Sequence, residues 1–126
     1  MTLAHGGTLT HQIIGLAMRV HSPLGPGLLE TAYEHCLSHE LNRVGLLYER
    51  QVDLPLVYDG VRLECGYRAD IIVGSEVVLE IKSIEHILPL HEAQLLTYLR
   101  LSPCRIGLLL NFNTTSLKHG IKRCVL

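Results

Sequence analysis

The order of segments along the chain predicts an α/β sandwich, in which a central mixed β-sheet is flanked by helices. Helical periodicity occupies the first third of the sequence, at about residues 10–21 and 28–44. Extended runs follow, then a third helix at about 90–101, and two strands end the chain. Because no linker, repeat or low-complexity segment interrupts the sequence, we expect residues 1–126 to form a single domain, with residues 1–9 as a flexible N-terminus.

The helices are supported by the spacing of apolar residues and by the residues at their ends. In the first helix, an apolar stripe is formed by Ile13, Ile14, Leu16, Ala17 and Val20. The Pro/Gly-rich segment 23–27 ends this helix, and Gly45 is suited to the C-cap of the second. The third helix is expected to start near Pro89, because proline favours the first turn, and to end before Pro103.

The strands are supported by β-branched residues and by turn signals. Two pairs of extended runs are expected, at residues 46–57 with 61–64 and at residues 67–73 with 76–82. The Asp59-Gly60 dipeptide favours a hairpin within the first pair. The nearly continuous apolar run 105–112 is typical of a strand covered on both faces, and a last strand at about 120–125 would close the sheet.

Two acids and a lysine lie inside the second pair of strands, as Asp70 in one run and Glu80 and Lys82 in the other. A carboxylate buried among apolar residues costs several kcal/mol unless it is paired or bound to a metal. Carboxylate oxygens are hard ligands that suit Mg²⁺ or Mn²⁺. The pattern therefore predicts a divalent metal site on the sheet, although a lone Glu-x-Lys is more often a solvated ion-pair face.

The connection between these two strands decides whether the three residues meet. Glu80 and Lys82 share a face because side chains alternate along a strand. An odd-length connection such as Gly74-Ser75-Glu76, or a bulge, would bring Asp70 to that face, whereas a two-residue Gly74-Ser75 turn would place Asp70 opposite Leu79. The residues alone do not decide between these connections.

The pattern Asp70, then Glu80-x-Lys82, resembles the PD-(D/E)XK nuclease superfamily, with Ala69 in place of its proline. Residues 27–33 read Gly-x-x-Glu-x-x-Tyr, and residues 94–98 read as the Gln-x-x-x-Tyr of RecB-like members. Together these motifs resemble the GxxExxY protein family, over a span from about Thr10 to Arg123. The resemblance implies a restriction-endonuclease-like αβα sandwich.

The resemblance also implies a role for each site residue. Asp70, Glu80 and the backbone carbonyl of Ile81 are expected to bind Mg²⁺ or Mn²⁺, and Lys82 to orient or deprotonate the attacking water. Glu30 is expected to hold a second metal or a metal-bound water, with Glu34 as a weaker competitor. Gln94 and Tyr98, four residues apart on one helical face, are assigned positioning roles through hydrogen bonds. The catalytic set is then Glu30, Asp70, Glu80, Lys82, Gln94 and Tyr98.

The leading functional prediction is a metal-dependent nuclease that hydrolyses phosphodiester bonds of nucleic acid. DNA is the first candidate substrate, and the sequence does not distinguish DNA from RNA. The alternative is a non-catalytic module that binds nucleic acid or protein, which a formal net charge of −1 favours because phosphate binding depends on Lys and Arg. A hydrolase of small phosphoesters is a third reading. Strand preference, endo or exo cleavage and metal number stay open at this point, and a homodimer is plausible by analogy.

Composition sets the expected setting of the protein. Hydrophobic residues make up 48% of the chain, so a packed domain is expected in place of a disordered one. The sequence shows no apolar run of about 20 residues and no signal-peptide pattern. We therefore expect a cytoplasmic protein that does not use a membrane.

Overall fold

The computed structural model describes the backbone of residues 5–126 and the side chains of residues 8–126. The first helix, α1 (His5–Leu24), starts earlier and ends later than the periodicity predicted. Pro23 lies within its last turn, and Gly25 ends it with a φ of 65°. The expectation of a flexible N-terminus falls partly on residues 1–4, which lie outside the described residues, while residues 5–9 are helical.

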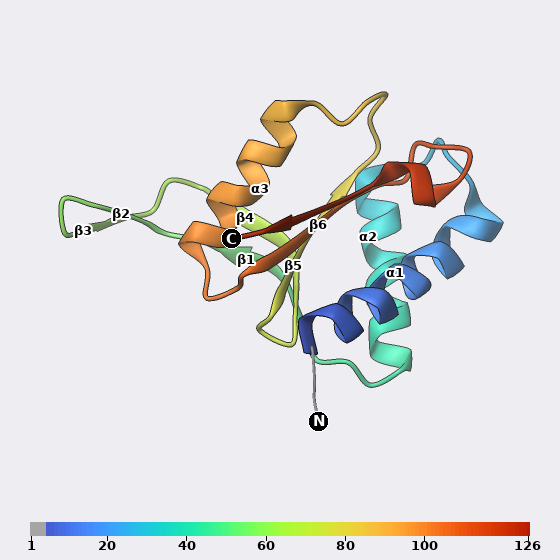
Figure 1. Ribbon diagram of the computed structural model, residues 1–126, viewed down its shortest axis with the longest axis horizontal. Coiled ribbons are helices and arrows are strands. Elements are labelled where there is room, and N and C mark those ends of the chain that lie inside the picture. The colour runs from blue at the N-terminus through green and yellow to red at the C-terminus, as the bar shows by residue number, and fades with distance from the viewer. Residues whose placement is uncertain (1–4) are drawn as a thin grey trace.

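A five-stranded mixed sheet forms the centre of the molecule (Figure 1). Its strands are, in spatial order, β1 (Tyr48–Asp53), β4 (Arg68–Val73), β5 (Val77–Lys82), β6 (Ile106–Asn111) and β7 (Ile121–Val125). Neighbours are antiparallel except for β5 and β6, which are parallel. Parallel strands need a crossover connection, and α3 (Pro89–Leu101) supplies it.

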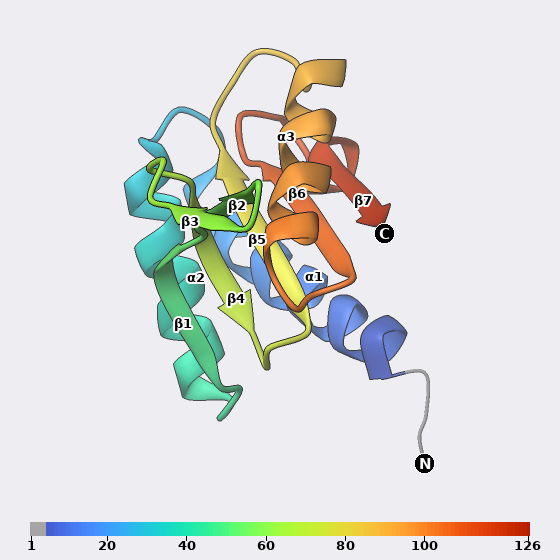
Figure 2. The ribbon, with the colours of Figure 1, turned by 90° about the vertical axis from the view of Figure 1, so that its left-hand side faces the viewer.

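The helices lie on both faces of this sheet, as Figures 1 and 2 show. Helices α1 and α2 (Glu30–Arg43) bury one apolar cluster, which includes Ile13, Leu37 and Leu79. Helix α3 buries a second cluster on the other face, which includes Leu95 and Leu109. The predicted α/β sandwich with a mixed sheet between helices is confirmed.

The run expected as one strand at residues 46–57 is divided in the structure. Its first part is β1 in the main sheet, and its end is β2 (Leu56–Tyr58), which pairs only with β3 (Val61–Leu63). Pro55 lies at the break, where the absence of a backbone N–H interrupts a ladder. The Asp59-Gly60 turn is confirmed, with positive φ angles of 53° and 73°. The β2–β3 hairpin projects from the main body in Figure 1, and in Figure 2 it lies in front of the sheet.

A short 3₁₀ helix, η1 (Leu117–Gly120), joins β6 to β7 and has no counterpart in the sequence prediction. Gly120 at its end packs directly on the chain, because a Cβ there would lie 2.1 Å from the carbonyl oxygen of Asn111. This close approach brings η1 to the end of the sheet at which β5 and β6 also end.

Candidate active site

The connection between β4 and β5 has the odd length that brings Asp70 and Glu80 to one face, as the predicted metal site requires. Ile71 pairs with Leu79 and Val73 with Val77, so residues 74–76 form a three-residue loop. Gly74 and Ser75 in this loop have positive φ angles of 59° and 55°. Continuation of the same register places Asp70 opposite Glu80, so the odd-length alternative is the one the chain adopts.

The two acids replace the strand ladder at this point. Backbone pairing between β4 and β5 stops at Ile71 and Leu79. Beyond it, the backbone N–H of Asp70 donates to Oε2 of Glu80 over 2.9 Å, and the N–H of Ile81 donates to Oδ2 of Asp70 over 2.8 Å. Each carboxylate therefore crosses to the opposite strand, which fixes Asp70 and Glu80 beside each other.

The surroundings of Asp70 and Glu80 offset only part of the cost of a negative charge on either carboxyl group. Burial, followed by repulsion from Asp70, raises the pKa of Glu80 to about 8. Burial also raises the pKa of Asp70 to about 6, and the charges of Glu34 and Glu30 act in the same direction. The backbone N–H bonds and Lys82 favour the ionised forms without offsetting the burial. A pair of buried acids in this condition fits a divalent cation, which would supply the missing positive charge.

Lys82 lies on the α3 face of the sheet, two residues after Glu80, and its side chain is half-buried. Its charge lowers the pKa of both Asp70 and Glu80, which places the ammonium group within electrostatic reach of the pair. The predicted acid, acid and lysine therefore come together at one end of β5.

Glu30 is the first residue of α2 and lies at the edge of this group. Its carboxylate accepts a hydrogen bond of 3.1 Å from the backbone N–H of Ser83, directly after Lys82. The Ser83 hydroxyl donates to the carbonyl of Leu28 over 2.8 Å. These two bonds attach the start of α2 to the end of β5, so Glu30 is held next to the acid pair.

Tyr33 gives a physical reason for the Gly-x-x-Glu-x-x-Tyr spacing. Its ring is fully buried and stacks on Phe112, with centroids 4.5 Å apart. Its hydroxyl donates to the carbonyl of Gly25 and accepts from the N–H of Leu28. Gly27 lies between these two contacts with a φ of 105°, a conformation that favours glycine. Tyr33 therefore holds the loop that presents Glu30.

The two residues predicted on α3 differ in their relation to the site. Burial raises the pKa of Tyr98, and the charges of Glu80 and Asp70 raise it further, so its hydroxyl stays protonated near the acid pair. The rings of Tyr67 and Tyr98 pack edge to face, with their centroids 6.2 Å apart. Gln94 lies one turn earlier and is exposed, and the hydrogen bonds found among residues 8–126 do not connect it to the acids.

Glu34 takes a role that sequence reasoning did not find. It is 4% exposed, and its carboxylate accepts from Nε and Nη2 of Arg50 at 3.1 and 3.0 Å and from Nε2 of Gln51 at 2.9 and 3.0 Å. Gln51 has a φ of 52°, and the β1–β4 ladder skips it, so its side chain is free to turn toward α2. The expectation of Glu34 as a competing metal ligand is replaced by a clamp between α2 and β1.

The donor set fits a hard cation in one respect and not in another. Mg²⁺ is commonly held by one or two carboxylates, with waters and substrate phosphates completing its shell. Asp70 and Glu80 meet that requirement, and Ile81 would add its carbonyl. However, the described residues contain no group of three or more His, Cys, Asp or Glu side chains arranged for a metal, so Glu30 is not clustered with the pair as a third carboxylate ligand.

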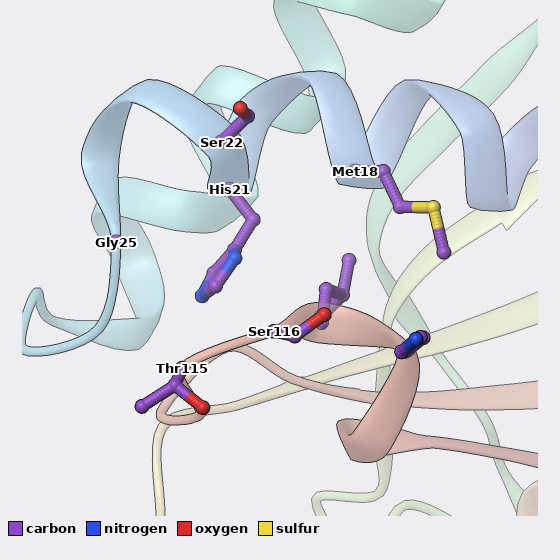
Figure 3. A pocket seen from close by; sticks show the side chains of 8 residues that line it. Met18, His21, Ser22, Gly25, Thr115 and Ser116 are labelled. Atoms are coloured by element: carbon purple, nitrogen blue, oxygen red, sulfur yellow. The ribbon is translucent and has the colours of Figure 1, made fainter.

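A cavity of about 350 Å³ lies elsewhere, between the end of α1 and η1 (Figure 3). Met18, Thr115 and Ser116 line it, and the ring of His21 points toward it. Nε2 of His21 is 3.0 Å from the carbonyl oxygen of Phe112, so the histidine has a structural contact. None of the six predicted catalytic residues lines this cavity.

One protein-family model matches nearly the whole chain. A model of the PD-(D/E)XK nuclease superfamily matches residues 7–124, a span that contains all five strands of the sheet up to Cys124 and every predicted site residue. Searches of curated proteins and of solved structures found no significant match. Among the described residues, no helix is long and apolar enough to cross a membrane.

Proposed function

We propose that this chain, which belongs to the PD-(D/E)XK nuclease superfamily, is a metal-dependent nuclease that hydrolyses phosphodiester bonds of nucleic acid, with DNA as the first candidate substrate. The main support is the pair of carboxylates that Asp70 and Glu80 form across the separated strand ends, beside Lys82. Within the superfamily, the Gly27, Glu30 and Tyr33 loop and the Gln94 and Tyr98 pair support the GxxExxY family as the narrower assignment.

Each residue then has a stated task. A bound Mg²⁺ or Mn²⁺ would lower the pKa of a water and offset charge on the phosphate. Asp70 and Glu80 would hold the cation through the oxygen of each that does not accept a backbone N–H. Lys82 orients the attacking water and stabilises negative charge that develops on the phosphate oxygens.

The remaining residues orient the substrate and the water. Glu30, fixed by Ser83, accepts a hydrogen bond from a water at the edge of the site. Tyr98 keeps its proton and donates a hydrogen bond to a phosphate oxygen. Gln94 is exposed on the same face of α3, and its side chain forms its hydrogen bonds with the substrate.

A non-catalytic module remains the second candidate, and one observation favours it. The projecting β2–β3 hairpin exposes apolar side chains, with Val57 65% and Tyr58 70% exposed, on a chain of net charge −1. Such a surface suits a protein partner better than a phosphate backbone. The homodimer and the cytoplasmic location are sequence-based predictions that go with either candidate.

The test begins with the metal, because it needs no knowledge of the substrate. Mn²⁺ is titrated by calorimetry into the wild type and into the double variant Asp70→Asn/Glu80→Gln. The matched control is Glu49→Gln/Asp59→Asn, which removes the same two charges from exposed positions. We expect binding by the wild type and the control and loss of binding in the site variant.

Cleavage of labelled DNA and RNA with Mg²⁺ or Mn²⁺ follows, with Lys82→Ala beside the wild type. We expect Lys82→Ala to retain Mn²⁺ binding and to lose turnover. Metal binding that survives in the Asp70→Asn/Glu80→Gln variant would contradict the assigned site. Wild-type protein that binds Mn²⁺ but leaves every DNA and RNA substrate intact would favour the non-catalytic module.

A further inference from the structure

A second polar cavity lies beside the candidate site, at the end of the sheet where β5 and β6 finish. Its volume is about 390 Å³. Its polar lining comes from the segment after β5, from the end of β6 and from the η1–β7 junction: Glu85, His86, Asn111, Thr114, His119 and Lys122. The proposed nuclease mechanism uses none of these side chains.

The strand register places two residues of this cavity, Asn111 and Lys122, on the same face as the acid pair. Glu80 pairs with Leu109 of β6, and Leu109 pairs with Lys122 of β7. Paired residues of neighbouring strands point to the same side of a sheet, so Glu80, Leu109 and Lys122 form a row on the α3 face. Lys82 and Asn111 pair in the next row of that face.

The register also sets the separation between the cavity and the site. Neighbouring strands lie about 4.8 Å apart, so the Cα atoms of Glu80 and Lys122 are separated by two strand spacings, about 10 Å. One strand of nucleic acid advances about 3.4 Å per nucleotide along a helix axis. A strand whose scissile phosphate lies at Asp70 and Glu80 would therefore pass Lys122 within the next few nucleotides.

The wall of the cavity nearest the site is rigid. Asn111 is 2% exposed, and its side chain accepts from the N–H of Ile84 at 3.1 Å and donates to the carbonyl of Ile84 at 3.0 Å. The backbone N–H of Phe112 donates to the carbonyl of Lys82 at 2.9 Å. These hydrogen bonds connect the segment that follows Lys82 to Asn111 and Phe112 at the end of β6, so they fix the position of the cavity relative to the site.

We propose that this cavity binds a backbone phosphate of the nucleic-acid strand that the candidate site cleaves, an inference that rests on the proposed function. Lys122 supplies a full positive charge, and His86 and His119, which line the cavity from two other segments, supply N–H donors. The hydroxyl of Thr114 already donates to the carbonyl of Asn111. Glu85 is the acid in this lining, and its charge offsets part of the charge of Lys122, so the histidine N–H donors contribute to phosphate binding beside Lys122. This subsite provides the local basic contact that a chain of net charge −1 needs in order to hold nucleic acid.

The experiment compares two neighbouring cations that point to opposite faces. Lys122 pairs with Leu109 on the α3 face, whereas Arg123 pairs with Leu108, which packs with α1 and α2 on the other face. Both side chains are exposed, so neither Lys122→Gln nor Arg123→Gln disturbs the core. Binding of a labelled single-stranded DNA oligonucleotide is measured by fluorescence anisotropy in EDTA over a range of salt concentrations.

We expect Lys122→Gln to weaken binding by about tenfold and to reduce the slope of log K against log salt by about 0.7, the value for one lost phosphate contact. Arg123→Gln should change neither quantity to that extent. A double variant, Lys122→Gln/His119→Gln, should weaken binding further. If the wild type cleaves DNA, Lys122→Gln should raise KM more than it lowers kcat.

The outcomes separate this subsite from the nuclease proposal. Equal effects of Lys122→Gln and Arg123→Gln, or no effect of either, would overturn the subsite even if the wild type cleaves DNA. A wild type that cleaves no substrate, with DNA binding that depends on Lys122 and not on Arg123, would overturn the nuclease and support the subsite.

Discussion

Replacement of Glu80 by glutamine should stabilise the metal-free protein. In the folded state, burial and the charge of Asp70 raise the pKa of Glu80 from 4.5 to about 8. Between those two values, the folded state retains a proton that the unfolded chain releases. The contribution of Glu80 to stability therefore falls as pH rises through this interval, and this contribution is highest below the unfolded pKa.

The size of the effect follows from this interval. Each pKa unit corresponds to about 1.36 kcal/mol, so three units of the interval cost about 4 kcal/mol at about pH 7.5. At about pH 5, close to the unfolded pKa, most of this cost is absent. Glutamine has no proton to lose, and its Oε1 is able to accept the N–H of Asp70 that Glu80 accepts at 2.9 Å. We expect Glu80→Gln to raise the free energy of unfolding by roughly 2–4 kcal/mol at about pH 7.5 and by much less at about pH 5.

The assay is urea unfolding in EDTA at both pH values, followed by circular dichroism, with exposed Glu49→Gln as the control. Addition of Mn²⁺ should then stabilise the wild type and leave Glu80→Gln unchanged, because only the wild type keeps both carboxylates. A variant that is less stable than the wild type at about pH 7.5, or a difference that does not depend on pH, would refute the assignment of Glu80 as an uncompensated buried acid.

Three further predictions test other parts of the site. Lys82→Ala should reduce cleavage at least about 100-fold and leave Mn²⁺ affinity unchanged, and a variant that retains cleavage would remove Lys82 from the mechanism. Arg50→Met removes the cationic partner of the buried Glu34 carboxylate, so the free energy of unfolding in urea should fall by about 3 kcal/mol. The double variant Arg50→Met/Glu34→Gln should recover part of this free energy. Tyr33→Phe removes both hydroxyl bonds of the loop before Glu30. It should cost about 1–2 kcal/mol and reduce kcat, and full activity in this variant would separate the loop from catalysis.

The layered fold was accessible from the sequence because local signals agree with the final structure. Apolar periodicity marked the helices, and the β-branched runs on either side of Gly74 marked β4 and β5 as neighbours. The division of the run at residues 46–57 was missed, although Pro55 lies at the break. A proline that ends one strand and begins a hairpin looks, in sequence, like an irregular edge.

The sequence predicted which two acids form the pair, but it did not predict the strand register that brings them together. One residue in the β4–β5 connection decides whether Asp70 faces Glu80 or Leu79. The chain has the longer loop, in which Gly74 and Ser75 both have positive φ angles. Gly74 signals that conformation in the sequence, whereas Ser75 does not. The register therefore required the structure.

The Glu34 clamp was inaccessible for a different reason. Its partner Arg50 lies 16 residues away, and the contact depends on how α2 packs against β1. Gln51 contributes only because its positive φ breaks the local alternation of side chains. A buried ion pair between a helix and a strand has no short-range signature, and the spacing of Glu30 and Glu34 on one helical face suggested a shared role that the structure divides.

The separation of β4 and β5 explains why the acids belong to the fold as well as to the site. Where the ladder stops, the N–H groups of Asp70 and Ile81 would lose their partners, and an unpaired buried N–H is costly. Oε2 of Glu80 accepts from the N–H of Asp70, and Oδ2 of Asp70 accepts from the N–H of Ile81. The two carboxylates therefore replace the backbone hydrogen bonds between the strands. These bonds occupy one oxygen of each acid, so the other oxygen of Asp70 and of Glu80 would be the one to hold a cation. The N–H bonds fix both carboxylates in the metal-free protein, and this preorganisation supports the proposed metal site at this position.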